Sequence, residues 1–250
     1  MDFGYGYGSC GATALEGGWV ITAAHCVVND YRDPVYGLSL TLYNSDGEKE
    51  LVRPMGDVDF FVPAGYYPPG QTEKEYFYGD LALIKVPELK DRTDIIYPRL
   101  PNSRREAEGG GIDNQILVTL GVGLTETGSF PEDLEFMSVT RKGAVGETPG
   151  FSRSYEIERD HFVAKDNGGE DQDACRGDSG GGIFIPSRRW VDLTADSELD
   201  RSARSLDYGE DVLVGVVSHG PTECGVPGAY TAYTDVYYWS DWIREIMSEN

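Results

Sequence analysis

Cys175-Arg176-Gly177-Asp178-Ser179-Gly180-Gly181-Gly182 is the most informative segment of the chain. It places a serine between glycines, directly after an aspartate, in a loop that begins at a cysteine. Glycines allow such a loop to expose the Ser179 hydroxyl and to turn the backbone N–H groups of Gly177 and Ser179 toward one point. The loop therefore offers a nucleophile beside a site for a developing negative charge.

Two stretches upstream complete a catalytic pattern. They are Thr22-Ala23-Ala24-His25-Cys26 and Gly79-Asp80-Leu81-Ala82-Leu83-Ile84, so His25, Asp80 and Ser179 follow one another in chain order. A serine hydroxyl is a weak nucleophile and needs a base, and a histidine, with an ordinary pKa of about 6.5, can take and return a proton. Taken alone, the stretch around Ser179 is typical of a turn, His25-Cys26 of a packed pair, and the stretch from Asp80 of the start of a strand. Together, in this order, they favour nucleophilic catalysis.

The pattern of the whole chain favours an all-β protein. Strand-like runs outnumber helical ones, and 32 of the 250 residues are glycine, which indicates many turns. Apolar residues recur at helical spacing only near the end of the chain, where they predict a C-terminal α-helix: Trp239, Trp242, Ile243 and Ile246.

At these motifs the sequence resembles the trypsin/chymotrypsin family of serine endopeptidases, over about residues 9–247. The resemblance implies two six-stranded antiparallel β-barrels with the active site between them, followed by the C-terminal helix. It assigns residues 1–108 to the first barrel, with His25 and Asp80, and residues 109–250 to the second, with Ser179. It also implies that His25 is the base, Asp80 its orienting group and Ser179 the nucleophile, and that the backbone N–H groups of Gly177 and Ser179 form the oxyanion hole.

The resemblance also implies a specificity pocket. Asp173 lies six residues before Ser179, where trypsin-like members place a carboxylate at the pocket floor, and Ala174 stands where a serine is common. A carboxylate can bind a guanidinium through two hydrogen bonds, so we expect cleavage after Arg and, less well, after Lys. The other expected substrate-binding residues are Ser218, His219, Gly220 and Gly228.

Three features of these assignments leave alternatives open. His219 replaces the tryptophan usual in the family, which predicts a more polar and pH-sensitive subsite rather than a second base. If Asp173 is not on the pocket floor, the enzyme has a non-tryptic preference. His161 falls in a polar stretch and is expected to be a surface or loop residue.

Asp178 is expected to form the activation pair of the family, in which it binds a newly cut N-terminal ammonium. The usual Ile-Val-Gly-Gly start is absent, and the chain as given is expected to begin inside the first barrel. We expect Asp178 to be exposed in a zymogen-like loop, with pairing to Lys142, Lys165 or Met1 as alternatives. A zymogen-like or catalytically silent homologue that binds a partner through the same cleft is therefore the rival of an active enzyme.

Four cysteines allow three pairings, and their even number indicates an oxidising compartment. Close Cys-x-x-Cys spacing, which zinc sites use, is absent. The resemblance selects the pairs Cys10–Cys26 and Cys175–Cys224. We therefore expect a secreted or periplasmic protein, although the chain shows no signal peptide.

The chain carries 43 acidic and 21 basic residues, for a net charge of −22. This excess repels phosphate backbones and anionic lipid, so we expect neither nucleic acid nor a membrane as partner. We interpret this negative charge mainly as a source of solubility or an adaptation to a salty or cold environment, with steering of cationic substrates as the alternative.

The expected partners are protein or peptide substrates with basic residues before the cleaved bond, and protein inhibitors. No cofactor or metal is expected, because the acidic turn around Asp46, Glu48 and Glu50 reads as a solvated surface.

Overall fold

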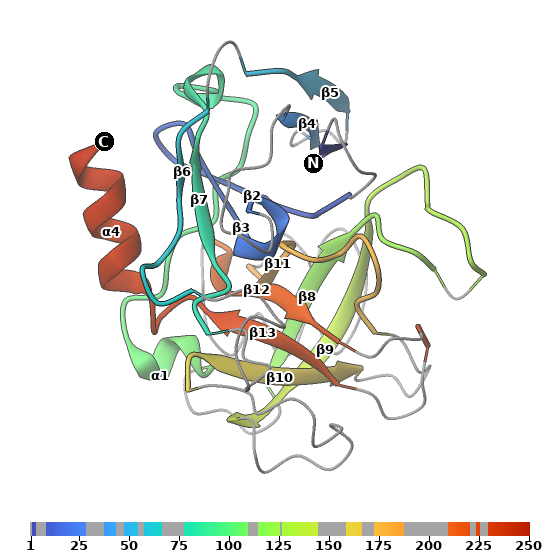
Figure 1. The fold of residues 1–250 in the computed structure, drawn as a ribbon. Helices are drawn as coiled ribbons and strands as arrows, with labels where there is room; N and C mark the ends of the chain where they lie inside the picture. The colour runs from blue at the N-terminus through green and yellow to red at the C-terminus, as the bar shows by residue number, and fades with distance from the viewer. Residues whose placement is uncertain are drawn as a thin grey trace.

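The fold is almost entirely antiparallel β-structure (Figure 1). The computed structural model describes residues 2–3, 9–28, 38–43, 48–54, 58–66, 78–109, 115–125, 127–144, 159–166, 173–187, 210–220, 224–225 and 230–250. Gly228, Met1 and the Asp46 turn position lie outside these residues. Among the described residues, none of the helices has the length and apolar character needed to cross a membrane.

Six strands of the second half close into a barrel in the order β10-β13-β12-β11-β8-β9. Their bounds are β8 Ile116–Gly121, β9 Glu135–Ala144, β10 His161–Asp166, β11 Gly182–Ile185, β12 Val212–His219 and β13 Thr231–Asp235. Every pair is antiparallel, and β11 and β13 are buried along their whole length. Strands buried on both faces read as continuous apolar runs, as Gly182–Ile185 and Val212–Val217 do.

The first half forms two antiparallel sheets in the described part of the chain, with strand orders β1-β4-β5 and β2-β3-β7-β6. The strands are β1 Asp2–Phe3, β2 Thr13–Leu15, β3 Trp19–Thr22, β4 Leu38–Tyr43, β5 Lys49–Val52, β6 Phe60–Phe61 and β7 Ala82–Lys85. The prediction of an all-β protein is confirmed, and the arrangement is consistent with the two predicted barrels. The closed six-stranded barrel lies in the second half.

The helices in the described part of the chain are few and short. They are the 3₁₀ helices η1 Ala24–Cys26 and η2 Pro87–Leu89, the one-turn helix α1 Arg104–Ala107 and the C-terminal helix α4 Ser240–Glu249. The predicted C-terminal helix is confirmed: Ile243 is fully buried, and Trp239, Trp242 and Ile246 pack against the core beside it. Figure 1 shows α4 alongside the first-half strands β6 and β7, although it follows the last strand of the barrel.

The two halves share one hydrophobic core. The larger buried cluster contains Trp19, Ile21 and Leu83 from the first half and Leu213 and Val216 from β12. A second cluster fills the barrel interior and includes the stacked rings of Phe162 and Tyr233. Because a substantial apolar surface lies between the halves, each half restrains the position of the other.

Truncation inside the barrel should be costly. Ile183 is fully buried in β11, so Ile183→Ala should lower the free energy of unfolding by about 2–5 kcal/mol through lost burial and a residual cavity. Ile96→Ala is the matched control, because Ile96 is 45% exposed and should cost little. Urea unfolding followed by tryptophan fluorescence measures both. Equal losses for the two variants would contradict the assigned core.

Candidate active site

The predicted base is held in a rigid setting. His25 sits in η1, directly after β3, between the buried residues Ala24 and Cys26. The Cys10–Cys26 disulfide, predicted from the resemblance, closes the loop beside it. The His25 ring lies within 4.8 Å of both sulfurs, but sulfurs joined in a disulfide offer no thiolate to a metal ion.

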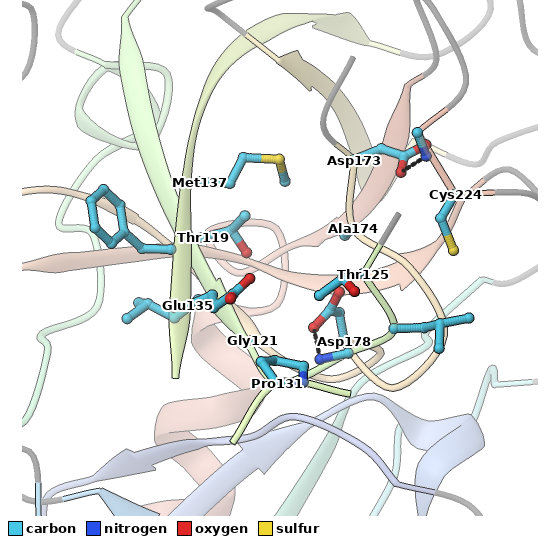
Figure 2. Close-up of a pocket in the computed structure, with 15 residues that line it drawn as sticks. Thr119, Gly121, Thr125, Pro131, Glu135, Met137, Asp173, Ala174, Asp178 and Cys224 are labelled. Atoms are coloured by element: carbon cyan, nitrogen blue, oxygen red, sulfur yellow. Dashed lines mark hydrogen bonds between the residues drawn. The ribbon is translucent and has the colours of Figure 1, made fainter. Parts of the chain in front are cut away.

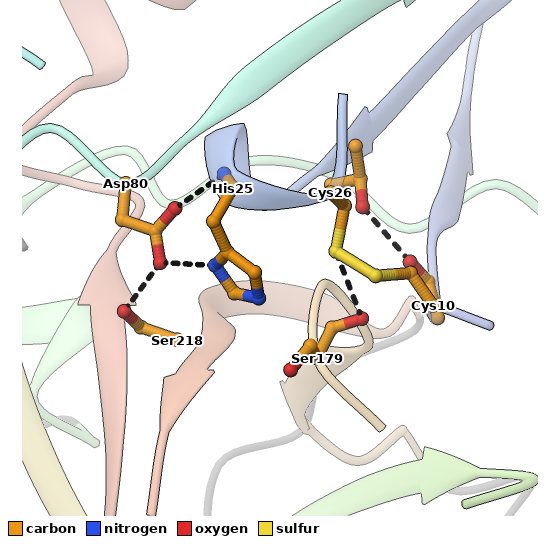
Figure 3. Close-up of a disulfide and its surroundings, with 8 residues drawn as sticks. Cys10, His25, Cys26, Asp80, Ser179 and Ser218 are labelled. Carbon is orange, nitrogen blue, oxygen red and sulfur yellow. Dashed lines mark hydrogen bonds and ion pairs between the residues drawn. A yellow bond between two sulfur atoms is a disulfide. The ribbon is translucent and has the colours of Figure 1, made fainter. Parts of the chain in front are cut away.

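Asp80 holds His25 at two points (Figure 3). Its Oδ1 accepts the backbone N–H of His25 at 3.0 Å, and its Oδ2 lies 2.8 Å from Nδ1 of the His25 ring. The Asp80 side chain is fully buried, whereas 26% of the His25 side chain is exposed. The contact fixes Nδ1 as the protonated nitrogen of neutral His25 and leaves Nε2 on the opposite side of the ring.

Ser179 lies on that opposite side. Figure 3 shows its side chain facing the Nε2 edge of the His25 ring, away from Asp80. The serine loop is fixed by contacts with the first half: the Ser179 carbonyl accepts the N–H of Gly11 at 2.7 Å and contacts Cys26 Sγ at 3.6 Å. Gly177 has a φ of +101°, the left-handed conformation that the sequence suggested only glycine would tolerate there.

Burial and charge act in opposite directions on this pair. Burial alone would lower the pKa of His25, but the Asp80 carboxylate and its hydrogen bond outweigh it, so the pKa is raised above the ordinary value. Burial likewise favours a higher pKa for Asp80, but His25 and the hydrogen bonds from His25 and Ser218 hold the pKa below its usual range. Asp80 therefore stays ionised beside a histidine that can accept a proton.

The family model described as Trypsin matches residues 3–243, nearly the whole chain. The chain belongs to the trypsin family of serine proteases.

Individual relatives agree with this assignment. Kallikrein 1-related peptidase b16 of Mus musculus is 26% identical over 249 residues, covering 96% of this chain and 81% of the relative. Serine protease ea of Drosophila melanogaster is 29% identical over 258 residues, covering 95% of this chain and 59% of the relative. The solved structure of mouse neuropsin, a serine protease, overlays with a TM-score of 0.63 at 20% identity, over 95% of this chain and 88% of neuropsin, which supports the shared fold.

A cavity of about 500 Å³ lies behind the serine loop of the protease (Figure 2). Asp173 and Ala174, the predicted floor of the specificity pocket, line it together with Asp178. Oδ1 of Asp173 accepts the N–H of Gly225 at 2.9 Å, and the predicted Cys175–Cys224 disulfide joins the same two segments. The disulfide therefore fixes Asp173 against the opposite wall of the cavity.

Asp178 departs from the expectation of an exposed carboxylate. It is half-buried and turned into the cavity, where it accepts the N–H of Gly123 at 2.8 Å and that of Cys175 at 2.9 Å. A Cβ at Gly121 or Gly123 would collide with its carboxylate, so these glycines make room for it. Within the described ranges no Lys or Arg forms an ion pair with Asp178, so the proposed pairing with Lys142 or Lys165 is wrong for this structure.

The cavity environment penalises the charge of Asp178. Burial raises the pKa of its carboxyl, the two backbone N–H groups oppose this, and the nearby Glu135 raises the pKa further. Figure 2 shows the Glu135 side chain reaching into the same cavity. A cationic group entering the cavity would meet three acidic side chains, those of Asp173, Asp178 and Glu135.

The residues predicted to line the substrate groove take positions that the sequence suggested only in part. Ser218 is 2% exposed, and its hydroxyl donates to Asp80 Oδ2 at 2.5 Å, so its side chain serves the carboxylate and does not face the groove. His219 follows it, and Nδ1 of its ring lies 3.2 Å from the Ser218 hydroxyl. Burial, then the neighbouring His161, lower the pKa of His219 to about 3, so the expected pH sensitivity near neutrality is wrong. Gly220 lies beside Ala174: a Cβ at this position would be 3.4 Å from the Ala174 carbonyl oxygen.

His161 is neither a surface nor a loop residue. It opens β10 and is 3% exposed, so the expectation from its polar neighbourhood is wrong. Its ring lies edge-on to that of His219, with centroids 5.9 Å apart. One local signal could have indicated this position: the apolar run after His161, Phe162-Val163-Ala164, is typical of a buried strand.

Removing the Asp80 charge should lower the pKa of His25. In Asp80→Asn the raising influence is lost while burial remains, so the pKa should fall below that of the wild type. Titration of the His25 ring by NMR measures the change, with Asp94→Asn as the control because Asp94 pairs with Arg92 at the surface.

The sign of the stability effect follows from the same shift. Because folding raises the pKa of His25, the pair stabilises the fold fully below the unfolded value of about 6.5, and this contribution is lost as pH rises through the folded pKa. An unchanged His25 pKa in Asp80→Asn would contradict the assigned pairing.

Proposed function

We propose that this protease hydrolyses peptide bonds through a triad of Ser179, His25 and Asp80. One observation carries the proposal. The buried carboxylate of Asp80 contacts His25 at Nδ1 and accepts its backbone N–H, while Ser179 faces the other edge of the ring. His25 takes the proton of the Ser179 hydroxyl as Oγ attacks the substrate carbonyl carbon. His25 then gives that proton to the leaving amine, which leaves an acyl-enzyme for water to hydrolyse.

The negative oxygen formed in each step needs hydrogen-bond donors. We assign this role to the backbone N–H groups of Gly177 and Ser179, and the left-handed φ of Gly177 supports it. Asp80 stabilises the imidazolium that forms transiently, without accepting its proton. Residues 1–108 would thus contribute the base and its carboxylate, and residues 109–250 the nucleophile and the oxyanion hole.

For specificity we assign Asp173 to the pocket that receives the side chain before the cleaved bond. Its place on the cavity wall next to Ala174 supports a preference for a cationic side chain. Arg can form a bidentate pair with a carboxylate, whereas Lys is a point charge for which Ala174 provides no hydroxyl, so Arg should be preferred. We assign His219, Gly220 and Gly228 to the walls of the substrate groove. Ser218 is assigned to the groove through its main-chain atoms, because its side chain binds Asp80.

We assign Asp178 to an activation pair with a chain N-terminus. Its inward carboxylate and the room around it support the binding of an ammonium group there.

The rival function is that of a silent homologue that binds partners through the cleft. Reaction with a serine-directed probe separates it from an active enzyme. Two disulfides support secretion or a periplasmic location, where protein substrates and protein inhibitors are the expected partners.

The nucleophile assignment is tested with a fluorophosphonate probe. Wild-type protein should be labelled covalently, and Ser179→Ala should abolish labelling and lower kcat on a peptide substrate by a factor on the order of 10⁶. Ser129→Ala is the matched control, because Ser129 lies in an exposed turn with Thr125 and Thr127, and it should be labelled normally. A wild type without labelling would favour the silent homologue, and labelling of Ser179→Ala would overturn the assignment.

The specificity assignment is tested with substrates that differ in one residue. Wild type should cleave an Arg amide faster than the Lys amide, and both faster than a Phe amide. Asp173→Ser should lower kcat/KM for the two basic substrates by about 100-fold or more and spare the Phe amide, since it removes a charge-assisted contact. Best cleavage of Phe or Leu substrates by wild type would overturn the tryptic preference.

A further inference from the structure

A second pair of aspartate and histidine lies beneath the proposed triad. Asp160 is fully buried and His161 is 3% exposed, and Nδ1 of His161 lies 2.9 Å from Oδ1 of Asp160. Neither residue has a place in the proposed chemistry. Buried polar pairs are costly unless their hydrogen bonds are satisfied, so the partners of this pair indicate what it does.

Asp160 holds the chain just before Asp80. Its Oδ2 accepts the backbone N–H of Gly79 at 2.8 Å and the indole N–H of Trp239 at 2.9 Å. The carboxylate thus accepts the N–H groups of Gly79 and Trp239 at Oδ2, and Nδ1 of His161 lies at its Oδ1. Gly79 is thus bound to a carboxylate that the second half of the molecule keeps in place.

His161 reaches the other end of Asp80 through Thr234. Nε2 of His161 lies 3.2 Å from the Thr234 hydroxyl, and that hydroxyl donates to the backbone carbonyl of Asp80 at 2.8 Å. His161 and Thr234 are directly opposite each other in the β10–β13 ladder, so their side chains share one face of the barrel. The pair therefore contacts the backbone N–H of Gly79 directly and, through Thr234, the backbone carbonyl of Asp80.

These two contacts matter because no strand ladder holds Asp80 itself. The β3–β7 pairing begins with Thr22 and Ala82, beyond Asp80 in the chain. The position of the Asp80 backbone thus depends on loop contacts, and two of them come from Asp160 and from Thr234. A shift of this backbone would move the carboxylate relative to His25.

We propose that Asp160 and His161 are positioning residues that lock the backbone of Asp80 so that its carboxylate meets His25 at hydrogen-bond distance. The inference rests on the proposed triad. A small misplacement of a catalytic group can lower a rate by as much as about 100-fold. Loss of either contact should therefore lower kcat and leave KM nearly unchanged, because the pair does not touch the substrate.

Two substitutions test the two contacts separately. Asp160→Asn keeps the shape of the side chain but replaces one acceptor oxygen with an NH₂ donor. Either the contact with His161 or the hydrogen bonds from Gly79 and Trp239 are then lost. Thr234→Val keeps the shape and removes the hydroxyl that joins His161 to the Asp80 carbonyl. Each should lower kcat on a peptide amide, and the rate constant of fluorophosphonate labelling, by about 10- to 100-fold, with KM within about twofold of wild type.

Matched variants separate positioning from general loss of packing. Thr234→Ser restores the hydroxyl and should recover both rates to within about twofold of wild type. Tyr97→Phe removes a hydroxyl that donates to the Leu89 carbonyl at 2.9 Å and leaves the contacts of Asp160 with Gly79 and of Thr234 with Asp80 in place, so both rates should stay unchanged. The NMR resonance of the His25 Nδ1 proton should move in Asp160→Asn and Thr234→Val and return in Thr234→Ser.

The outcomes are distinguishable. Wild-type kcat and labelling in both Asp160→Asn and Thr234→Val would overturn the inference, as would a Thr234→Ser variant as slow as Thr234→Val. Absence of labelling in the wild type would instead overturn the proposed triad. Circular dichroism and thermal unfolding are recorded for every variant, and if Asp160→Asn fails to fold, the Thr234 pair decides the matter alone.

Discussion

The fully buried carboxylate of Asp80 is the constraint around which the structure is arranged. An ionised carboxylate removed from water is costly unless charged and hydrogen-bonding partners surround it. Those partners come from both halves: His25 from the first, and the Ser218 hydroxyl, 138 residues away, from the second. The halves must therefore meet in one register for Asp80 to be satisfied, and the same register brings Ser179 to the far edge of the His25 ring.

The sequence alone carried most of the information about the residues of the proposed triad. His25, Asp80 and Ser179 each lie in a short stretch whose composition reflects a local need: a tight helical turn, a strand start, a glycine-rich loop. The all-β class and the C-terminal helix were accessible for the same reason, since turn residues and helical spacing are local signals. The pairing of the four cysteines came from the family resemblance. The closed barrel of the second half followed from family resemblance rather than from any single stretch.

The supporting contacts could not be read in the same way. Thr234 acts on Asp80 across 154 residues and Asp160 on Gly79 across 81, and nothing in the residues beside Thr234 or Asp160 indicates those partners. The burial of Asp178 depends on space left by Gly121 and Gly123, which only the fold brings against it. The polar neighbours of His161 in the chain conceal its strand position inside the barrel. In each case the deciding contact is long-range.

The core shared by the two halves has a consequence for engineering. Trp19 and Leu83 pack in one cluster with Leu213 and Val216, and α4, which ends the chain, contributes Ile243 to the same cluster. A fragment cut at the junction of the halves would expose an apolar face that normally never meets water, and would tend to aggregate before finding its complement. This protease is thus poorly suited to use as a split reporter whose fragments wait separately in solution, whereas insertions in surface turns would leave the common core intact.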